Sequence, residues 1–178
     1  LNDLPDTLTA DAVTVSHTHP DHNHVKAVKG SPMILFEPGV TQVGNIKITG
    51  LMGWEGSPEG ENHEMRNVIF IFETDGAKVV QLGDSGVIEN EHVLKAVMDA
   101  DLVIVNIDGY VIAHAEIMPF MRRIHARSVL PAHYTMPGRE VWNGAPTVDE
   151  FIVEFAPNEK VVRTESHFEI HAGMPHQI

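Results

Sequence analysis

Residues 16–24 read SHTHPDHNH, which places four histidines and an aspartate within nine residues of a chain that has no cysteine. The stretch continues an apolar run, ADAVTVSH at 10–17, which has the pattern of a short buried strand. His17 and His19 stand two positions apart at the end of that strand, so its alternation points both side chains to the same side. The chain must therefore fold so that several imidazoles gather at one strand end.

The residues after His19 bring two further donors to the same place. A proline turns the chain, and Asp21 and His22 then begin a predicted short helix at 21–30. An H-x-H-x-D-H pattern at a strand end indicates metal binding rather than a surface loop that happens to be rich in histidine. His24 lies further along the predicted helix, and we expect it to face solvent or to support a ligand.

The composition limits what the chain can bind. Lys and Arg number 12 and Asp and Glu number 25, so the net charge is -13, which disfavours a nucleic-acid partner. With no cysteine, a transition-metal site must use His, Asp and Glu. No apolar run approaches the ~18 residues of a membrane span, and no basic, apolar leader opens the sequence. We therefore expect a single domain over residues 1–178, cytoplasmic, with a small-molecule substrate and no membrane or nucleic-acid partner.

Hydrophobic periodicity outlines a mixed α/β fold. Alternation over 41–51 favours a hairpin, and NVIFIFETDGAKVVQLGD at 67–84 favours a second one around its Asp-Gly turn. Further strands are predicted at 32–39, 101–109, 127–134, 160–164 and 167–171, and helices at 90–100, 114–126 and 147–156. Strands dominate the first half and strand–helix alternation the second, which suits sheets covered by helices on their outer faces.

Three more candidate donors lie next to predicted strands. Asp84 in LGDSG comes just after a strand, and His133 in LPAHY comes just after another. His63 in ENHEMRN lies in a loop that leads into a strand. Sheet proteins gather their sites at strand ends. These side chains are therefore candidates to complete the metal coordination shells, because one strand and one turn cannot supply all the ligands. The GDSG sequence lacks the G-x-S-x-G elbow of a serine hydrolase.

With these pieces together, the sequence resembles the metallo-β-lactamase-fold hydrolases. Within them it is most similar to the group that includes ascorbate-6-phosphate lactonase and the N-acylphosphatidylethanolamine phospholipase D type. The matching pieces are SHTHPDH, NHEMRNVIFIFETDGAKVVQLGDSG, DADLVIVNIDGY and SVLPAHY, and they span residues 10 to about 135. The resemblance implies an αββα sandwich, of the α/β class, with a two-metal site along one sheet edge.

The same resemblance implies a role for each donor. One metal would be held by His17, His19 and His63, the other by Asp21, His22 and His133, with Asp84 bridging both. Two divalent ions, Zn²⁺ or alternatively Mn²⁺ or Fe, can share a hydroxide that attacks a carbonyl or phosphorus centre. The expected catalytic residues are Asp21, Asp84 and Tyr134, with Tyr134 donating to the substrate.

We therefore expect a metal-dependent hydrolase of a small ester, lactone or phosphoester. The alternatives are a phosphodiesterase or nuclease of the same fold, and a non-catalytic metal-binding module. The resemblance implies several strands before the H-x-H-x-D-H segment, so we expect roughly fifty further residues before it. We expect a preceding segment of the same chain, or a partner chain in a homo-oligomer, to pair with the AVTVS strand.

Overall fold

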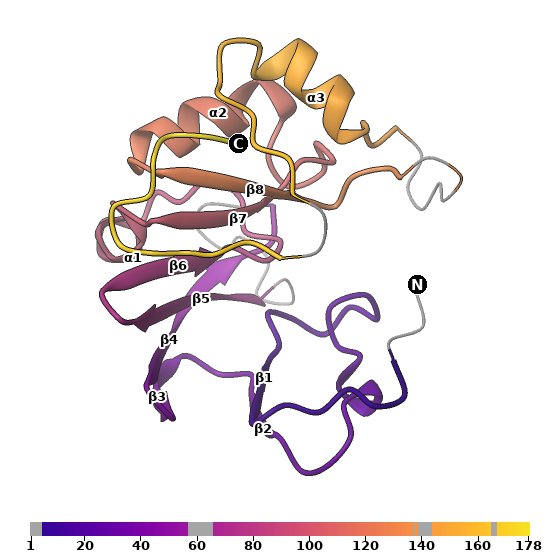
Figure 1. The fold of residues 1–178 in the computed structure, drawn as a ribbon, viewed down its shortest axis with the longest axis vertical. Helices are drawn as coiled ribbons and strands as arrows, with labels where there is room; N and C mark the ends of the chain where they lie inside the picture. Colours follow the sequence, from indigo (N-terminus) through magenta and orange to yellow (C-terminus); the bar gives the residue numbers. More distant parts are fainter. Residues whose placement is uncertain (1–4, 57–65, 137, 139–143, 165–166) are drawn as a thin grey trace.

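The computed structural model describes residues 5–56, 66–136, 138, 144–164 and 167–178. Its main element is a six-stranded mixed sheet in the order β3-β4-β5-β6-β7-β8 (Figure 1). The strands are β3 (Gly39–Val43), β4 (Ile46–Trp54), β5 (Arg66–Thr74), β6 (Ala77–Gln81), β7 (Leu102–Asn106) and β8 (Ser128–Ala132). The mixed α/β fold expected from the sequence is confirmed.

Two hairpins build the antiparallel part of this sheet. The first joins β3 to β4, with Val43 opposite Ile46. The second joins β5 to β6, and the two residues between them, Asp75 and Gly76, have φ of 49° and 79°. These are the left-handed values that a two-residue hairpin turn needs. Both predicted hairpins are thereby confirmed, and β6, β7 and β8 then run parallel to one another.

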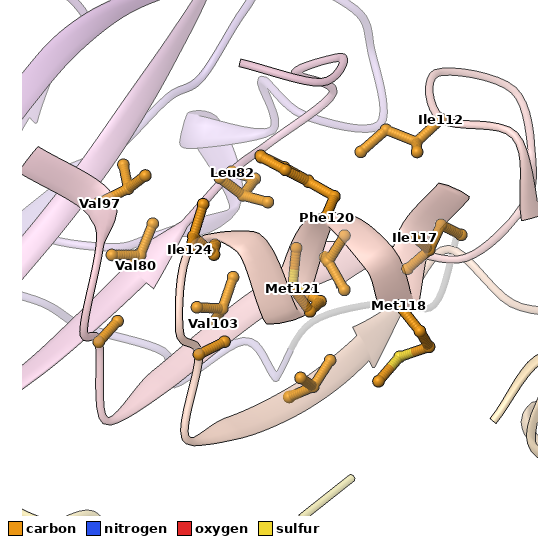
Figure 2. Packing of buried hydrophobic residues seen from close by; sticks show 14 of the residues in the cluster. Val80, Leu82, Val97, Val103, Ile112, Ile117, Met118, Phe120, Met121 and Ile124 are labelled. Atoms are coloured by element: carbon orange, nitrogen blue, oxygen red, sulfur yellow. The ribbon is translucent and has the colours of Figure 1, made fainter. Parts of the chain in front are cut away.

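Three helices cover one face of the main sheet. They are α1 (Glu91–Val97), α2 (His114–Arg123) and α3 (Val148–Phe155). Their buried side chains and the facing side chains of β5 to β8 form the larger hydrophobic core. Figure 2 shows Phe120, Met121 and Ile124 of α2 and its C-terminal end together with Val80 and Val103 of the strands. Burying each such side chain contributes about 1.5–3 kcal/mol, so this core holds the helix layer on the sheet.

The other face of the main sheet packs against a small second sheet. Its strands, β1 (Ala12–Thr14) and β2 (Met33–Leu35), pair in parallel and lie at the end of the molecule away from α2 and α3 (Figure 1). Leu35 packs against Ile48, Val68 and Phe70 of β4 and β5. The Val68 N–H also donates to the Ser16 carbonyl at 2.7 Å. The start of the histidine-rich stretch is thus fixed against the main sheet.

The helix predicted at 21–30 is wrong. Only Val25–Ala27 form a single turn of 3-10 helix. Asp21 and His22 lie in a turn, where the His22 N–H donates to the His19 carbonyl at 3.0 Å. A tight turn lets neighbouring side chains face a common point, whereas a helix would spread them around its axis. The turn therefore serves the site better than the predicted helix.

The strands predicted at 160–164 and 167–171 are also wrong, since the described residues of both ranges lie outside any ladder. The chain end makes scattered backbone bonds instead: Val162 and Lys160 both bond to Ile178, and Gln177 bridges Ser128 of β8. The apolar alternation there belongs to side chains that stay partly exposed, such as Val162 at 37%. No helix among the described residues has the length and apolarity to cross a bilayer.

Candidate metal centre

The direction of the strands brings four strand ends to one edge of the main sheet. β6, β7 and β8 are parallel, and β4 runs the same way as β6 because both are antiparallel to β5. Their carboxyl ends therefore meet at one edge. Each is followed within three residues by a side chain with a metal-binding atom: Glu55 after β4, Asp84 after β6, Asp108 after β7 and His133 after β8.

The histidine-rich turn lies against this edge and points its imidazoles at one another. His17 is buried, and its Nε2 lies 3.1 Å from Nδ1 of His19. The Ser16 hydroxyl oxygen lies 3.0 Å from Nδ1 of His17 and 3.3 Å from Nδ1 of His22. The Nδ1 atoms of His17 and His22 thus face Ser16, while their Nε2 atoms face the other donors.

Asp84 stands between the two groups of histidines. Its Oδ1 lies 3.2 Å from Nε2 of His22, and its Oδ2 lies 3.6 Å from Nε2 of His17. Asp84 is 5% exposed, and its carboxylate accepts a hydrogen bond from the Asn106 amide at 2.6 Å. The Asp84 N–H donates to Asn67 Oδ1 at 3.1 Å. Each carboxylate oxygen is therefore held toward a different imidazole, which is the arrangement that a bridging ligand requires.

His133 completes the other side of the site from a distant part of the chain. Its Nε2 lies 3.0 Å from Nε2 of His22, although the two residues are 111 positions apart. Asp21 Oδ2 lies 3.6 Å from the same His22 nitrogen and 4.0 Å from that of His133. Two ligands of one ion, each about 2.0–2.2 Å from it, lie roughly 3.0–3.5 Å apart. The imidazole spacing fits that value.

Asp108 orients His133 from behind. Its Oδ2 accepts from the His133 Nδ1–H at 3.1 Å, and its Oδ1 accepts from the Tyr110 N–H at 2.9 Å. Burial alone would raise the pKa of Asp108, but these hydrogen bonds outweigh it and lower the pKa. The hydrogen bond to Asp108 in turn raises the pKa of His133 against the effect of burial. A carboxylate that accepts a hydrogen bond from the Nδ1–H of an imidazole makes Nε2 of the same ring a stronger metal donor.

The pKa values of two imidazoles in the turn, those of His17 and His22, are lowered, which favours their neutral form. Burial, reinforced by the neighbouring His22, lowers the pKa of His17 to about 4. Burial also lowers the pKa of His22, although Asp84 opposes the change. A neutral imidazole keeps a lone pair, which is the form that binds metal. Neutral imidazoles beside carboxylates are the donor set of a Zn²⁺, Mn²⁺ or Fe site in a chain without thiols, so the residues present fit such ions.

A cavity of about 580 Å³ opens onto these donors. Six of its lining side chains carry metal-binding atoms: His19, Asp21, Glu55, Asp84, Asp108 and His133. No lysine or arginine is among the described residues that line it. Tyr110 lines the cavity, whereas Tyr134 is 36% exposed and stands outside the described lining.

The structure brings together every predicted ligand that it describes. These fall into three overlapping groups: His17 with His22 and Asp84, His17 with His19 and Glu55, and Asp21 with His22 and His133. His63 lies outside the described residues, so its predicted role stays a prediction. Sequence reasoning missed Glu55, Asp108 and the supporting Ser16 and Asn106. The signal that could have found Glu55 and Asp108 is their place just after a strand, as for Asp84 and His133.

The fold and the site at the sheet edge agree with what the comparison with known families finds. A family model described as a β-lactamase superfamily domain matches residues 2–133. The chain belongs to this family.

Individual relatives agree with the assignment. A UPF0173 metal-dependent hydrolase from Thermococcus onnurineus (strain NA1) is 24% identical over an alignment of 155 residues, gaps included; the match covers 73% of this chain and 69% of that protein. A proposed Zn-dependent hydrolase of the metallo-β-lactamase superfamily from Thermotoga maritima is 29% identical, with a TM-score of 0.68 over 88% of this chain and 74% of that one. An isothiocyanate hydrolase from Delia radicum gut bacteria is 16% identical and shares the fold, with a TM-score of 0.59 over 81% of this chain and 68% of that one.

Proposed function

We propose that this chain is a metal-dependent hydrolase whose cavity holds two divalent metal ions and cleaves a small ester, lactone or phosphoester. The observation that carries the proposal is one cavity on which carboxylates and imidazoles converge and which no described lysine or arginine lines. Carboxylates gathered away from bulk water need compensating cations. The relatives from Thermococcus onnurineus and Thermotoga maritima, which bear the names of metal- and Zn-dependent hydrolases, support the same function.

The donors divide into two half-sites that share Asp84. The first half-site contains His17 and His19 with a third donor, and the second contains Asp21, His22 and His133. Asp84 offers Oδ2 to the first and Oδ1 to the second. Two half-sites suit two ions, because these donors exceed the four ligands that one Zn²⁺ takes.

When bound, two divalent ions would lower the pKa of a water molecule and polarise the bond to be cleaved. Asp21, whose side chain is 26% exposed, would accept a hydrogen bond from the attacking water and orient it. Asp108 keeps a proton on Nδ1 of His133, so Nε2 of that ring stays free to bind metal. Tyr134 remains the predicted donor to the substrate, and Tyr110 is the tyrosine that lines the cavity.

The cavity supports a small substrate rather than a polymer. Its volume of about 580 Å³ lies within the range of small-molecule sites. Two dications would offset the carboxylates that line it, so a neutral ester or lactone, or a small phosphoester, could enter without charge repulsion. The net charge of -13 over the whole chain opposes binding of a nucleic-acid strand. Membership of the lactonase and phospholipase D-like group is part of this proposal.

Metal analysis and a substrate panel test the proposal together. Protein purified without chelator is expected to hold about two transition-metal ions per chain. The panel contains a lactone, a p-nitrophenyl ester, bis-p-nitrophenyl phosphate, a β-lactam and an isothiocyanate, and hydrolysis that a chelator abolishes is expected for one of the first three. A stoichiometry of one or less after addition of Zn²⁺ or Mn²⁺ would count against the two-ion site. A full metal complement without turnover would favour the non-catalytic module.

A further inference from the structure

The third donor of the first half-site is the part of the centre that the sequence-based prediction assigns to His63. Among the described residues, the structure places Glu55 beside His17 and His19. Its Oε2 lies 3.7 Å from Nδ1 of His19, which lies 3.1 Å from Nε2 of His17. The ligand atoms of the three residues all lie within 4.8 Å of one another. Ligands of a common ion are separated by roughly 3.0–3.5 Å, so an ion could bind all three after small side-chain movements.

The backbone holds Glu55 in this position. Glu55 directly follows β4 and forms an antiparallel bridge with Ser85, in the loop that carries Asp84. Two backbone hydrogen bonds next to this bridge also join the two segments. The Gly56 N–H donates to the Asp84 carbonyl at 3.3 Å, and the Gly86 N–H donates to the Trp54 carbonyl at 3.2 Å. The carboxylate of Glu55 is therefore fixed relative to Asp84 by main-chain contacts.

The surroundings of Glu55 leave its charge poorly compensated. The residue is 3% exposed, and among the described residues its only ion-pair partner is His19. The carboxylates of Asp84 and Asp21 line the same cavity as Glu55. A buried carboxylate in such a place is either protonated or bound to a cation. Two imidazole nitrogens beside it favour the cation.

With Glu55 included, the two half-sites have the same donors. Each has two imidazole nitrogens and one carboxylate, and Asp84 lies between them. Two histidines with one carboxylate are typical of non-haem Fe(II) sites, and carboxylates suit Mn²⁺, whereas additional imidazoles suit Zn²⁺. A glutamate in place of a histidine therefore moves the preference of the first half-site away from zinc.

We propose that Glu55, and not His63, is the third ligand of the first half-site, and that it makes the centre less selective for Zn²⁺ over Mn²⁺ or Fe²⁺ than a histidine there would. This inference rests on the proposed function, because it requires a cavity that binds two ions. It concerns which residue holds the first ion and which metal that residue favours.

Manganese binding to metal-stripped protein tests the ligand. Wild type, Glu55→Gln and His63→Gln are loaded with Mn²⁺, desalted, and measured for bound manganese and for the paramagnetic resonance spectrum. We expect two ions per chain in wild type and in His63→Gln, and one in Glu55→Gln. The resonance signal of a coupled manganese pair should be replaced by the six-line signal of an isolated ion only in Glu55→Gln. The exposed Glu169→Gln removes the same charge elsewhere and should match wild type. Two ions in Glu55→Gln would overturn the assignment, as would one ion in His63→Gln.

The outcomes separate this inference from the proposed function. If wild type binds one ion or none, the two-ion function itself fails. If wild type binds two and Glu55→Gln also binds two, only the role of Glu55 fails. Circular dichroism and a thermal melt confirm that each variant is folded. If Glu55→Gln does not fold, Glu55→His replaces it, since it keeps a donor at the position and should retain two ions.

Glu55→His also tests the metal preference. Competition between Zn²⁺ and Mn²⁺ is measured for wild type and variant at equal ionic strength. The ratio of zinc to manganese affinity is expected to rise at least about tenfold in the variant, because a third imidazole replaces a carboxylate in the first half-site. An unchanged or smaller ratio would overturn the proposed preference, whatever the activity of the loaded protein.

Discussion

Ser16 shows how one hydroxyl can prepare two metal ligands. Its oxygen lies within hydrogen-bond distance of Nδ1 of both His17 and His22, and a hydroxyl oxygen has two acceptor lone pairs. When both rings donate their Nδ1–H to Ser16, both Nε2 atoms carry lone pairs toward the cavity. Ser16 itself is 6% exposed and is held by the bond between its carbonyl and the Val68 N–H. The residue is therefore a positioning residue for two ligands at once.

Replacing this hydroxyl should weaken metal binding more than it weakens the fold. Ser16→Ala keeps the backbone bond to Val68 but removes the hydroxyl that faces Nδ1 of the buried His17 and the half-buried His22, so the imidazoles lose their fixed tautomer and orientation. Metal affinity is expected to fall about 10- to 100-fold, measured by chelator competition. Ser85→Ala is the matched control, because Ser85 is also buried but donates to the Gly86 carbonyl. Equal affinities in the two variants would contradict the role given to Ser16.

The residues of the candidate site differ in how easily they can be recognised from the sequence. His17, His19, Asp21 and His22 are close in the chain, so their spacing alone predicts that they meet. Asp84 and His133 were accessible through their positions after strands. Glu55 was not recognised because it opens an acidic, glycine-rich stretch that has the composition of a solvated loop. Its burial comes from the bridge to Ser85, a tertiary contact that no local pattern records.

At the scale of elements, local signals predicted most of what the structure shows. The Asp75-Gly76 turn fixes its hairpin because both residues adopt positive φ. The helix predicted at 21–30 is wrong because Asp21 and His22 lie in a turn, which lets their side chains converge on the site. The strands predicted at 160–164 and 167–171 failed because strand pairing depends on a partner edge, and the last residues of the chain make only isolated bonds beside β8.

The N-terminus of α3 is a local element whose stability depends on pH in a predictable direction. Thr147 accepts from the Glu150 N–H at 3.2 Å, and Glu150 accepts in return from the Thr147 N–H at 2.8 Å. This backbone hydrogen bond lowers the pKa of Glu150 below its ordinary value of 4.5. A carboxyl group whose pKa is lower in the folded state stabilises the fold above its unfolded pKa and loses that effect as the pH falls through the folded pKa.

Glu150→Gln should therefore lower the melting temperature at neutral pH, and the difference from wild type should shrink as the pH falls below the ordinary glutamate pKa of 4.5. Thermal melts of metal-stripped protein across this range measure it. Glu154→Gln is the control, since Glu154 is exposed on α3 outside the cap. A difference from wild type that stays constant with pH would mean that the charge of Glu150 does not contribute through the cap.

On the scale of the whole molecule, the strand directions concentrate negative charge at one edge of the sheet. Asp21, Glu55, Asp84 and Asp108 all line the same cavity, in a chain of net charge -13. The fold holds these carboxylates close together, whereas the unfolded chain separates them. Cations that bind this edge therefore bind the folded state selectively, so metal binding should be coupled to the stability of the whole sheet.

Removal of metal should consequently destabilise the protein, and metal should restore it. At a free metal concentration of 100 times Kd, one ion adds about 2.7 kcal/mol, and in a chain of this length that raises the melting temperature by roughly 5–10 °C. Thermal melts before chelation, after chelation, and at increasing Mn²⁺ or Zn²⁺ measure the effect. Asp84→Asn should show a smaller rise, because it loses the carboxylate that faces both half-sites. A melting temperature that ignores chelation, in protein shown by elemental analysis to have lost its metal, would mean that the converging carboxylates are stable without cations and that the edge is not a metal centre.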